Sequence, residues 1–99
     1  MANDSTHGLE LWTTTGTEAS TKLVKDINPG TADAWGHFSE NNLMPFGDKV
    51  IFNADDGVNG AELWISDGTS AGTKMVKDIH TTGGSGPKYF HVYKNMVIF

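Results

Sequence analysis

The densest group of oxygen donors in this sequence lies in one short loop, residues 53–62. Asp55, Asp56 and Asn59 stand close together there, and Ca²⁺ takes roughly six to eight oxygen ligands of this kind. The loop therefore has the chemistry of a calcium site, although its spacing is not that of an EF-hand. The second interpretation is a hairpin turn in which the same oxygens accept backbone amides and Glu62 caps the turn.

A second group of side chains could bind a sugar. Trp35 is followed by His37, Asn41 and Asn42 in a stretch with no regular apolar spacing. An indole ring can stack on the apolar face of a sugar, and neighbouring amides can hydrogen-bond its hydroxyls. The other interpretation is that Trp35 packs onto an adjacent sheet. These four residues are the candidate ligand-binding site.

The remaining polar residues do not indicate catalysis. The histidines show neither the spacing of metal ligands nor a triad pattern with an acid; they are His7, His37, His80 and His91. Glu10 and Glu62 could supply paired carboxylates for glycoside hydrolysis, but they occupy one position of an internal repeat, which is typical of framework residues. Arg is absent, which argues against a hydrolase that binds a carboxylate substrate. We predict that the chain is not an enzyme.

Composition argues against several classes of partner. The 99 residues carry seven Lys and twelve acidic residues, for a net charge of -5, so nucleic acid is not an expected partner. We also expect no membrane insertion, because no apolar run approaches roughly 18 residues. The first residues lack the pattern of a signal peptide, and cysteine is absent, which excludes disulfides and thiolate zinc sites. These features leave the cellular location open.

The elements that must position these side chains belong to an internal repeat. Residues 2–27 align with residues 54–79 at an offset of 52, and 15 of these 26 positions are identical. Farther along, Val50–Phe52 aligns with Val97–Phe99 at an offset of 47, so the first copy carries a short insertion, which we place in a loop. We treat residues 1–99 as one module of two repeats, approximately 2–52 and 54–99.

Each copy of the repeat predicts four short strands. β-branched and aromatic residues cluster in runs bounded by Gly, Asn and Asp, as in strands joined by tight turns. In the complete copy these runs are Leu43–Phe46, Lys49–Asn53, Ala61–Ser66 and Lys74–Ile79. Helix is disfavoured, because no stretch of about ten residues keeps a helical apolar period. Four antiparallel strands that recur about every 50 residues indicate a β-propeller blade.

The predicted fold is all-β: a β-propeller with two four-stranded blades per chain, one whole and two halved. The half blades are the strands near 8–14 and 21–27, and those near 89–93 and 96–99. Each blade presents apolar faces to its neighbours, so two blades alone leave such faces in water. We therefore expect head-to-tail homo-oligomerisation into a closed ring. At two blades per chain, a trimer has about six blades and a tetramer about eight. The alternative is an excised piece of a longer array.

The repeated blocks ELWTTTGTEAST and ELWISDGTSAGT resemble the bacterial ELWxxDGT repeat family. The second block fits better, because Thr15 and Ser20 of the first stand where Asp67 and Gly72 stand in the second. The resemblance implies tandem propeller-like blades from large secreted or surface-attached bacterial proteins, used as adhesion or scaffold modules. The turn at Asp67 is also similar to the Asp-box of sialidase-type propellers, in which the Asp accepts turn amides and has a structural role.

The predicted function is therefore a non-enzymatic, self-assembling propeller module for binding or scaffolding. Carbohydrate is the specific ligand predicted, because a ring repeats a weak site several times and gains avidity. The alternative is a purely structural surface-protein repeat without a small ligand. Trp12 and Trp64 share one repeat position and are predicted to lie in the core between blades. Tyr89, His91 and Tyr93 alternate along a predicted first strand, and we expect them to pack between blades; the alternative is that they line the central channel.

Overall fold

Three antiparallel sheets and no helix make up the part of the chain that the computed structural model describes, residues 1–34 and 43–99. The first sheet contains β1 (Ala2–Asn3), β2 (Leu9–Thr13) and β3 (Lys22–Lys25); the second contains β4 (Met44–Phe46), β5 (Lys49–Asp55), β6 (Ala61–Ser66) and β7 (Lys74–Lys77); the third contains β8 (His91–Tyr93) and β9 (Met96–Ile98). The all-β prediction is confirmed. Over these same residues, no helix is long and apolar enough to cross a bilayer.

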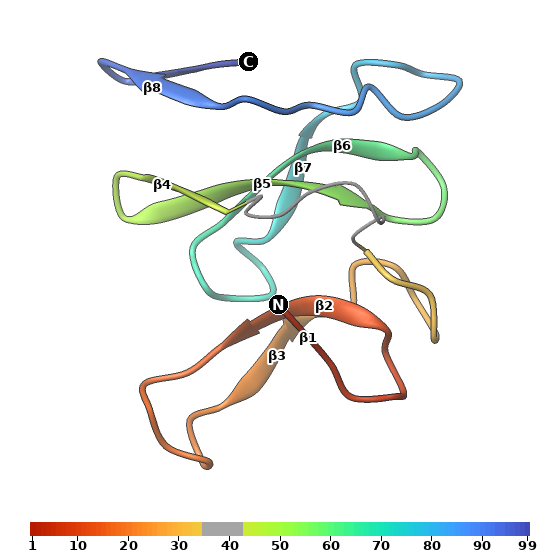
Figure 1. The fold of residues 1–99 in the computed structure, drawn as a ribbon, viewed down its shortest axis with the longest axis vertical. Helices are drawn as coiled ribbons and strands as arrows, with labels where there is room; N and C mark the ends of the chain where they lie inside the picture. Colours follow the sequence, from red (N-terminus) through yellow and green to blue (C-terminus); the bar gives the residue numbers. More distant parts are fainter. Residues whose placement is uncertain (35–42) are drawn as a thin grey trace.

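The second sheet lies between the other two, with β1–β3 on one side and β8–β9 on the other (Figure 1). Its four strands are adjacent in chain order, β4-β5-β6-β7, because tight turns connect each strand to the next one. None of the three sheets closes on itself. The two outer sheets are smaller, with three and two strands in the described residues.

Glycine is required at one turn position of both repeats. Gly8 and Gly60 have φ angles of 72° and 75°, in the left-handed region that other residues rarely adopt. A Cβ atom at Gly8 would overlap the backbone of Ala32, and one at Gly60 would overlap the backbone of Gly84. These glycines let the loop that follows each sheet pass directly over the start of β2 or β6.

The pairing register is repeated between the first and second sheets. β5 pairs with β6 over six positions, from Val50 opposite Ser66 to Asp55 opposite Ala61. The pairing of β6 with β7 shifts between Leu63 and Trp64. The pairing of β2 with β3 shifts at the same repeat position, between Leu11 and Trp12. A shift of this kind is a β-bulge, which bends a strand and re-aims its side chains.

The apolar core lies between the first and second sheets. Its buried members are Leu11, Val24, Ile27, Ala34, Phe52, Ala54 and Trp64. The prediction that Trp64 is core is confirmed, and Trp12 is only half-buried. Lys25 also joins the two sheets: its Nζ donates to the carbonyl of Thr73 at 3.0 Å and lies 6.0 Å from the centre of the Trp64 ring.

Several predicted strand limits were wrong. β7 ends at Lys77 rather than Ile79, and β5 continues to Asp55. Tyr89 lies before β8 with a φ of 60° and is 80% exposed, so it does not continue the alternation of that strand. Tyr93 is also exposed, as is His91. The packing of these three residues between blades stays a prediction.

Candidate functional site

The loop predicted as a calcium site forms an Asx turn in the structure. The Asp55 carboxylate accepts the backbone N–H of Gly57 at 2.7 Å. One Asp56 oxygen accepts the N–H groups of Val58 and Asn59 at 2.9 and 2.7 Å, and the other accepts the Asn59 side-chain amide at 2.7 Å. Although burial opposes ionisation, the bonds from Asn59 and Val58 lower the pKa of Asp56.

These bonds engage one oxygen of Asp55 and both oxygens of Asp56. No cluster of three or more His, Cys, Asp or Glu side chains able to hold a metal occurs within residues 1–34 and 43–99. Calcium binding at Asp55, Asp56 and Asn59 stays a prediction. The capping role expected of Glu62 was wrong, because its carboxylate accepts bonds from residues 79–85 and not from this turn.

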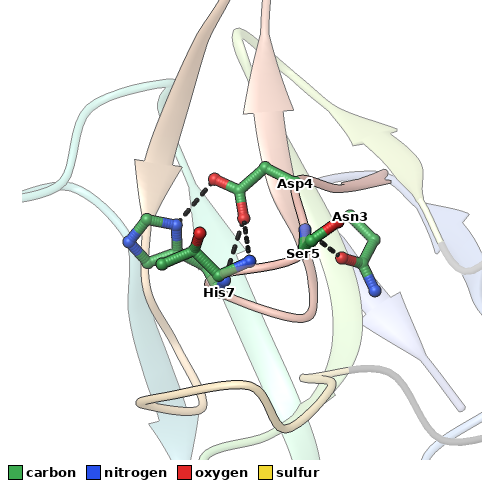
Figure 2. Close-up of polar contacts among 5 residues, drawn as sticks. Asn3, Asp4, Ser5 and His7 are labelled. Atoms are coloured by element: carbon green, nitrogen blue, oxygen red, sulfur yellow. Dashed lines mark hydrogen bonds and ion pairs between the residues drawn. The ribbon is translucent and has the colours of Figure 1, made fainter.

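The equivalent turn of the first repeat contains an ion pair (Figure 2). Asp4 accepts the N–H groups of Thr6 and His7 through one oxygen, and its other oxygen lies 2.7 Å from Nδ1 of His7. The hydrogen bond to the His7 side chain lowers the pKa of Asp4 to about 2. The same bond raises the pKa of His7. Sequence reasoning missed this pair; the signal was that His7 occupies the position of Asn59.

The candidate sugar-binding residues cannot be placed. Trp35, His37, Asn41 and Asn42 all lie outside the described residues. Their grouping as a binding site stays a prediction.

Two buried glutamates act as framework residues, as predicted from their repeat position. The carboxylate of Glu10 accepts the backbone N–H groups of Ile27 and Asn28, both at 3.0 Å. Glu62 makes the corresponding bonds to the N–H groups of Ile79 and His80, at 3.3 and 3.2 Å. Each glutamate thereby ties the chain that leaves the last strand of a sheet back to the strand before it.

The two glutamates have opposite pKa shifts. Burial raises the pKa of Glu10, and the two backbone N–H groups do not fully offset it. Glu62 is equally buried, but it also accepts the hydroxyl and the backbone N–H of Ser85. Burial opposes ionisation there too, yet these additional donors lower the pKa of Glu62. At an offset of 52, the first repeat has Asp33 where the second has Ser85, and a carboxylate cannot donate in this way.

A cleft of about 430 Å³ opens between the first and second sheets. Its lining includes Leu11, Trp12 and Val24 from the first sheet and Val50 and Asp67 from the second. The cleft therefore continues the core between the sheets outward, towards Trp12.

A group of exposed apolar residues lies on and beside β7 and on the β8–β9 hairpin. The face of the second sheet that points away from the core has Val76 and Ile79 exposed, and the β8–β9 hairpin has five exposed apolar residues that are between 45% and 54% accessible. They are Val92, Tyr93, Met96, Ile98 and Phe99. We name these seven residues the outer apolar surface. Strand alternation puts Tyr93, Met96 and Ile98 on one face of the hairpin and Val92 on the other. Exposed apolar side chains that gather in this way mark interaction sites on soluble proteins.

Two residues of the outer apolar surface, Val76 and Ile79, correspond to buried core residues of the first repeat. Val24 and Val76 occupy the same repeat position, but Val24 is 7% exposed and Val76 is 53% exposed. Ile27 is 4% exposed, whereas the equivalent Ile79 is 46% exposed. The residue types are identical, so the difference arises because the second sheet covers Val24 and Ile27, whereas no described element covers their counterparts to that extent.

Comparison of the chain with known protein families, curated proteins and solved structures gave no match. The resemblance to the ELWxxDGT repeats thus stays a prediction from the repeated motif.

Proposed function

We propose that this chain is a two-blade module of a β-propeller that assembles with further copies of itself. The observation that carries the proposal is the different burial of equivalent residues: Val24 and Ile27 are core, and Val76 and Ile79 are exposed. Burying a Val or Ile side chain contributes roughly 1.5–3 kcal/mol. A second copy of the first sheet would cover this face as the second sheet covers Val24 and Ile27.

The blade interpretation is supported by the second sheet. Its strands follow one another as a four-stranded antiparallel meander, which is the arrangement of a propeller blade. The first sheet repeats the register of β5, β6 and β7, and the β8–β9 hairpin repeats that of β4 and β5. We propose a head-to-tail ring, a trimer or a tetramer, because one face of the module fits the opposite face of the next.

The module acts as a binding or scaffold unit rather than an enzyme. Its buried carboxylates bind backbone amides, and its exposed Asp turns bind their own amides. Carbohydrate binding through Trp35 and its neighbours remains the prediction for a ligand, and a surface-protein repeat without a small ligand remains the alternative.

Native mass spectrometry of the chain at about micromolar concentration tests the proposal. We expect a trimer or tetramer of the wild type. The variant Val76→Asp should be monomeric, because burial of an unpaired carboxylate costs several kcal/mol. The matched control is Val58→Asp, since Val58 is 86% exposed in a turn outside the outer apolar surface; this variant should assemble normally.

A wild type that stays monomeric at that concentration would refute self-assembly. An oligomer that forms equally well with Val76→Asp would show that this face is not the one that is covered.

A further inference from the structure

One edge of β2 has open backbone groups. β1 pairs with β2 only at Leu9 and Glu10, whereas β5 pairs with the equivalent β6 as far as Ser66. No described residue pairs with the same edge of β2 from Leu11 onward. Open strand edges present unpaired N–H and C=O groups that can pair with another chain.

β9 is the strand of this sequence that matches the open edge. It is the counterpart of the first half of β5: Ile98 and Phe99 correspond to Ile51 and Phe52. Ile51 is 2% exposed and Phe52 is fully buried, but Ile98 is 53% exposed and Phe99 is 51% exposed. β9 pairs with β8 on one side only, so its second edge is open within the described residues.

The two open edges cannot meet within one chain as it is folded here. The β8–β9 hairpin and the first sheet lie on opposite sides of the second sheet (Figure 1). No described strand of the same chain therefore occupies the β2 edge, and a second copy is the source of the strand that the proposed self-assembly supplies.

We infer that β9 of a second copy pairs with β2 in the register of β5 and β6, placing Phe99 opposite Trp12, Ile98 opposite Thr13 and Val97 opposite Thr14. This inference rests on the proposed self-assembly and adds its register. The template is the pairing of Phe52 with Trp64, Ile51 with Ile65 and Val50 with Ser66. The product is a composite sheet of β8 and β9 from one copy and β2 and β3 from the next, with β1 alongside β2.

The same template accounts for the outer apolar surface. In the composite sheet, Trp12 takes the place that Trp64 has against the first sheet. Trp64 packs in one core with Val24 and Ile27, so Trp12 of the next copy would cover Val76 and Ile79. Lys77 corresponds to Lys25 and would reach Trp12 and the carbonyl of Thr21, as Lys25 reaches Trp64 and Thr73.

Disulfide cross-linking tests the register, because the chain has no cysteine. We would prepare the double variants Thr13→Cys/Ile98→Cys and Thr14→Cys/Val97→Cys, which place the thiols opposite each other. Adjacent antiparallel pairs alternate between wide and close Cα spacing, so one of the two aligned pairs is of the close type. The control Thr13→Cys/Val97→Cys is offset by one residue, which turns the two side chains to opposite faces.

After oxidation, we expect an aligned variant to give covalently linked chains in a denaturing gel. The largest band should contain as many chains as the ring. The offset control should give at least about tenfold less product. Native mass spectrometry of the reduced variants first shows whether each one assembles. An assembled ring in which neither aligned pair cross-links, or in which the offset pair cross-links equally well, overturns the register and leaves self-assembly standing.

Hydrogen exchange of the wild type provides a second measurement that needs no substitution. On dilution of the assembled protein to monomer, edge-facing amides of residues 11–14 should exchange about tenfold faster or more, because their partner strand is lost. Unchanged exchange in this segment would also overturn the inference. A protein that is monomeric throughout would instead refute the proposed function.

Discussion

At the scale of single residues, the Thr15 and Ser20 departures of the first repeat from the ELWxxDGT motif form one coupled exchange. In the second repeat Asp67 accepts the N–H and the hydroxyl of Thr69 at 2.9 and 2.6 Å, which confirms its predicted role as a turn acceptor. In the first repeat the hydroxyl of Ser20 accepts the N–H groups of Thr15 and Thr17 instead. The acceptor has moved to the other side of the turn.

This exchange predicts a strong coupling between positions 67 and 72. A Cβ at Gly72 would overlap the Asp67 carboxylate, so Gly72→Ser should displace Asp67 from its turn bonds and cost about 1 kcal/mol of unfolding free energy. The double variant Asp67→Thr/Gly72→Ser recreates the first repeat and should recover at least about 1 kcal/mol of the summed single costs. Urea unfolding of the four proteins measures the coupling. Strictly additive costs would contradict the coupled exchange.

The buried glutamates share a repeat position and two backbone donors, but their pKa values shift in opposite directions. Burial and the charge of Asp26 raise the pKa of Glu10, whereas the hydroxyl and the backbone N–H of Ser85 add donors to Glu62. The folded-state pKa of Glu62 is lowered, so its contribution to stability is present above the ordinary pKa of Glu. That contribution is lost as the pH falls through the lowered value. Glu10 has the opposite sign, because its pKa is raised.

Replacement of Ser85 should therefore have a pH-dependent cost. Ser85→Ala removes a donor to the ionised Glu62, and we expect a loss of about 1.5 kcal/mol at pH 7. The loss should shrink below about pH 4, where the carboxylate becomes protonated. Urea unfolding at fixed protein concentration across this range measures it, and Ser85→Thr, which keeps a hydroxyl, serves as the control. An equal loss at both ends of the range would contradict the role assigned to Ser85.

At the scale of elements, the repeat and the turn residues predicted most of the sheets. The number and order of strands in the complete copy agree with β4–β7. Short apolar runs separated by turns that contain Gly and Asp are typical of antiparallel strands and of few other structures. The bulges beside Trp12 and Trp64 were not predicted, because a bulge depends on hydrogen bonding between strands rather than on residue type. Tyr89 was wrongly placed, because its positive φ is set by the turn around it and is uncommon for a Tyr.

The candidate site was predictable to a smaller degree. The identical residues of the repeat indicated which positions form the framework, and Glu10, Glu62 and Trp64 are buried accordingly. The sequence alone could not show that Val76 and Ile79 differ from Val24 and Ile27, since the residue types are the same. That difference depends only on which sheet has a neighbour.

At the scale of the whole molecule, the proposed self-assembly predicts that stability depends on protein concentration, because Val24 and Ile27 are buried and Val76 and Ile79 are exposed. Ile27→Ala should cost about 2–5 kcal/mol at every protein concentration, because Ile27 is buried within one chain. Ile79→Ala should cost less than about 0.5 kcal/mol in dilute monomer, and its cost should grow as the chains assemble. Unfolding at two concentrations on either side of assembly measures both effects. Equal concentration dependence for the two variants would contradict this account.

The Asx turns at Asp4 and Asp56 share one backbone geometry but carry different side chains, His7 in one and Asn59 in the other. In a circular assembly of identical chains, these two turns alternate from sheet to sheet. The edge of the ring that carries these turns then has half as many equivalent positions as the ring has sheets. In mildly acidic surroundings protonated His7 would neutralise Asp4 in every second turn, so a ligand with the same angular spacing would be presented with alternating neutral and anionic turns.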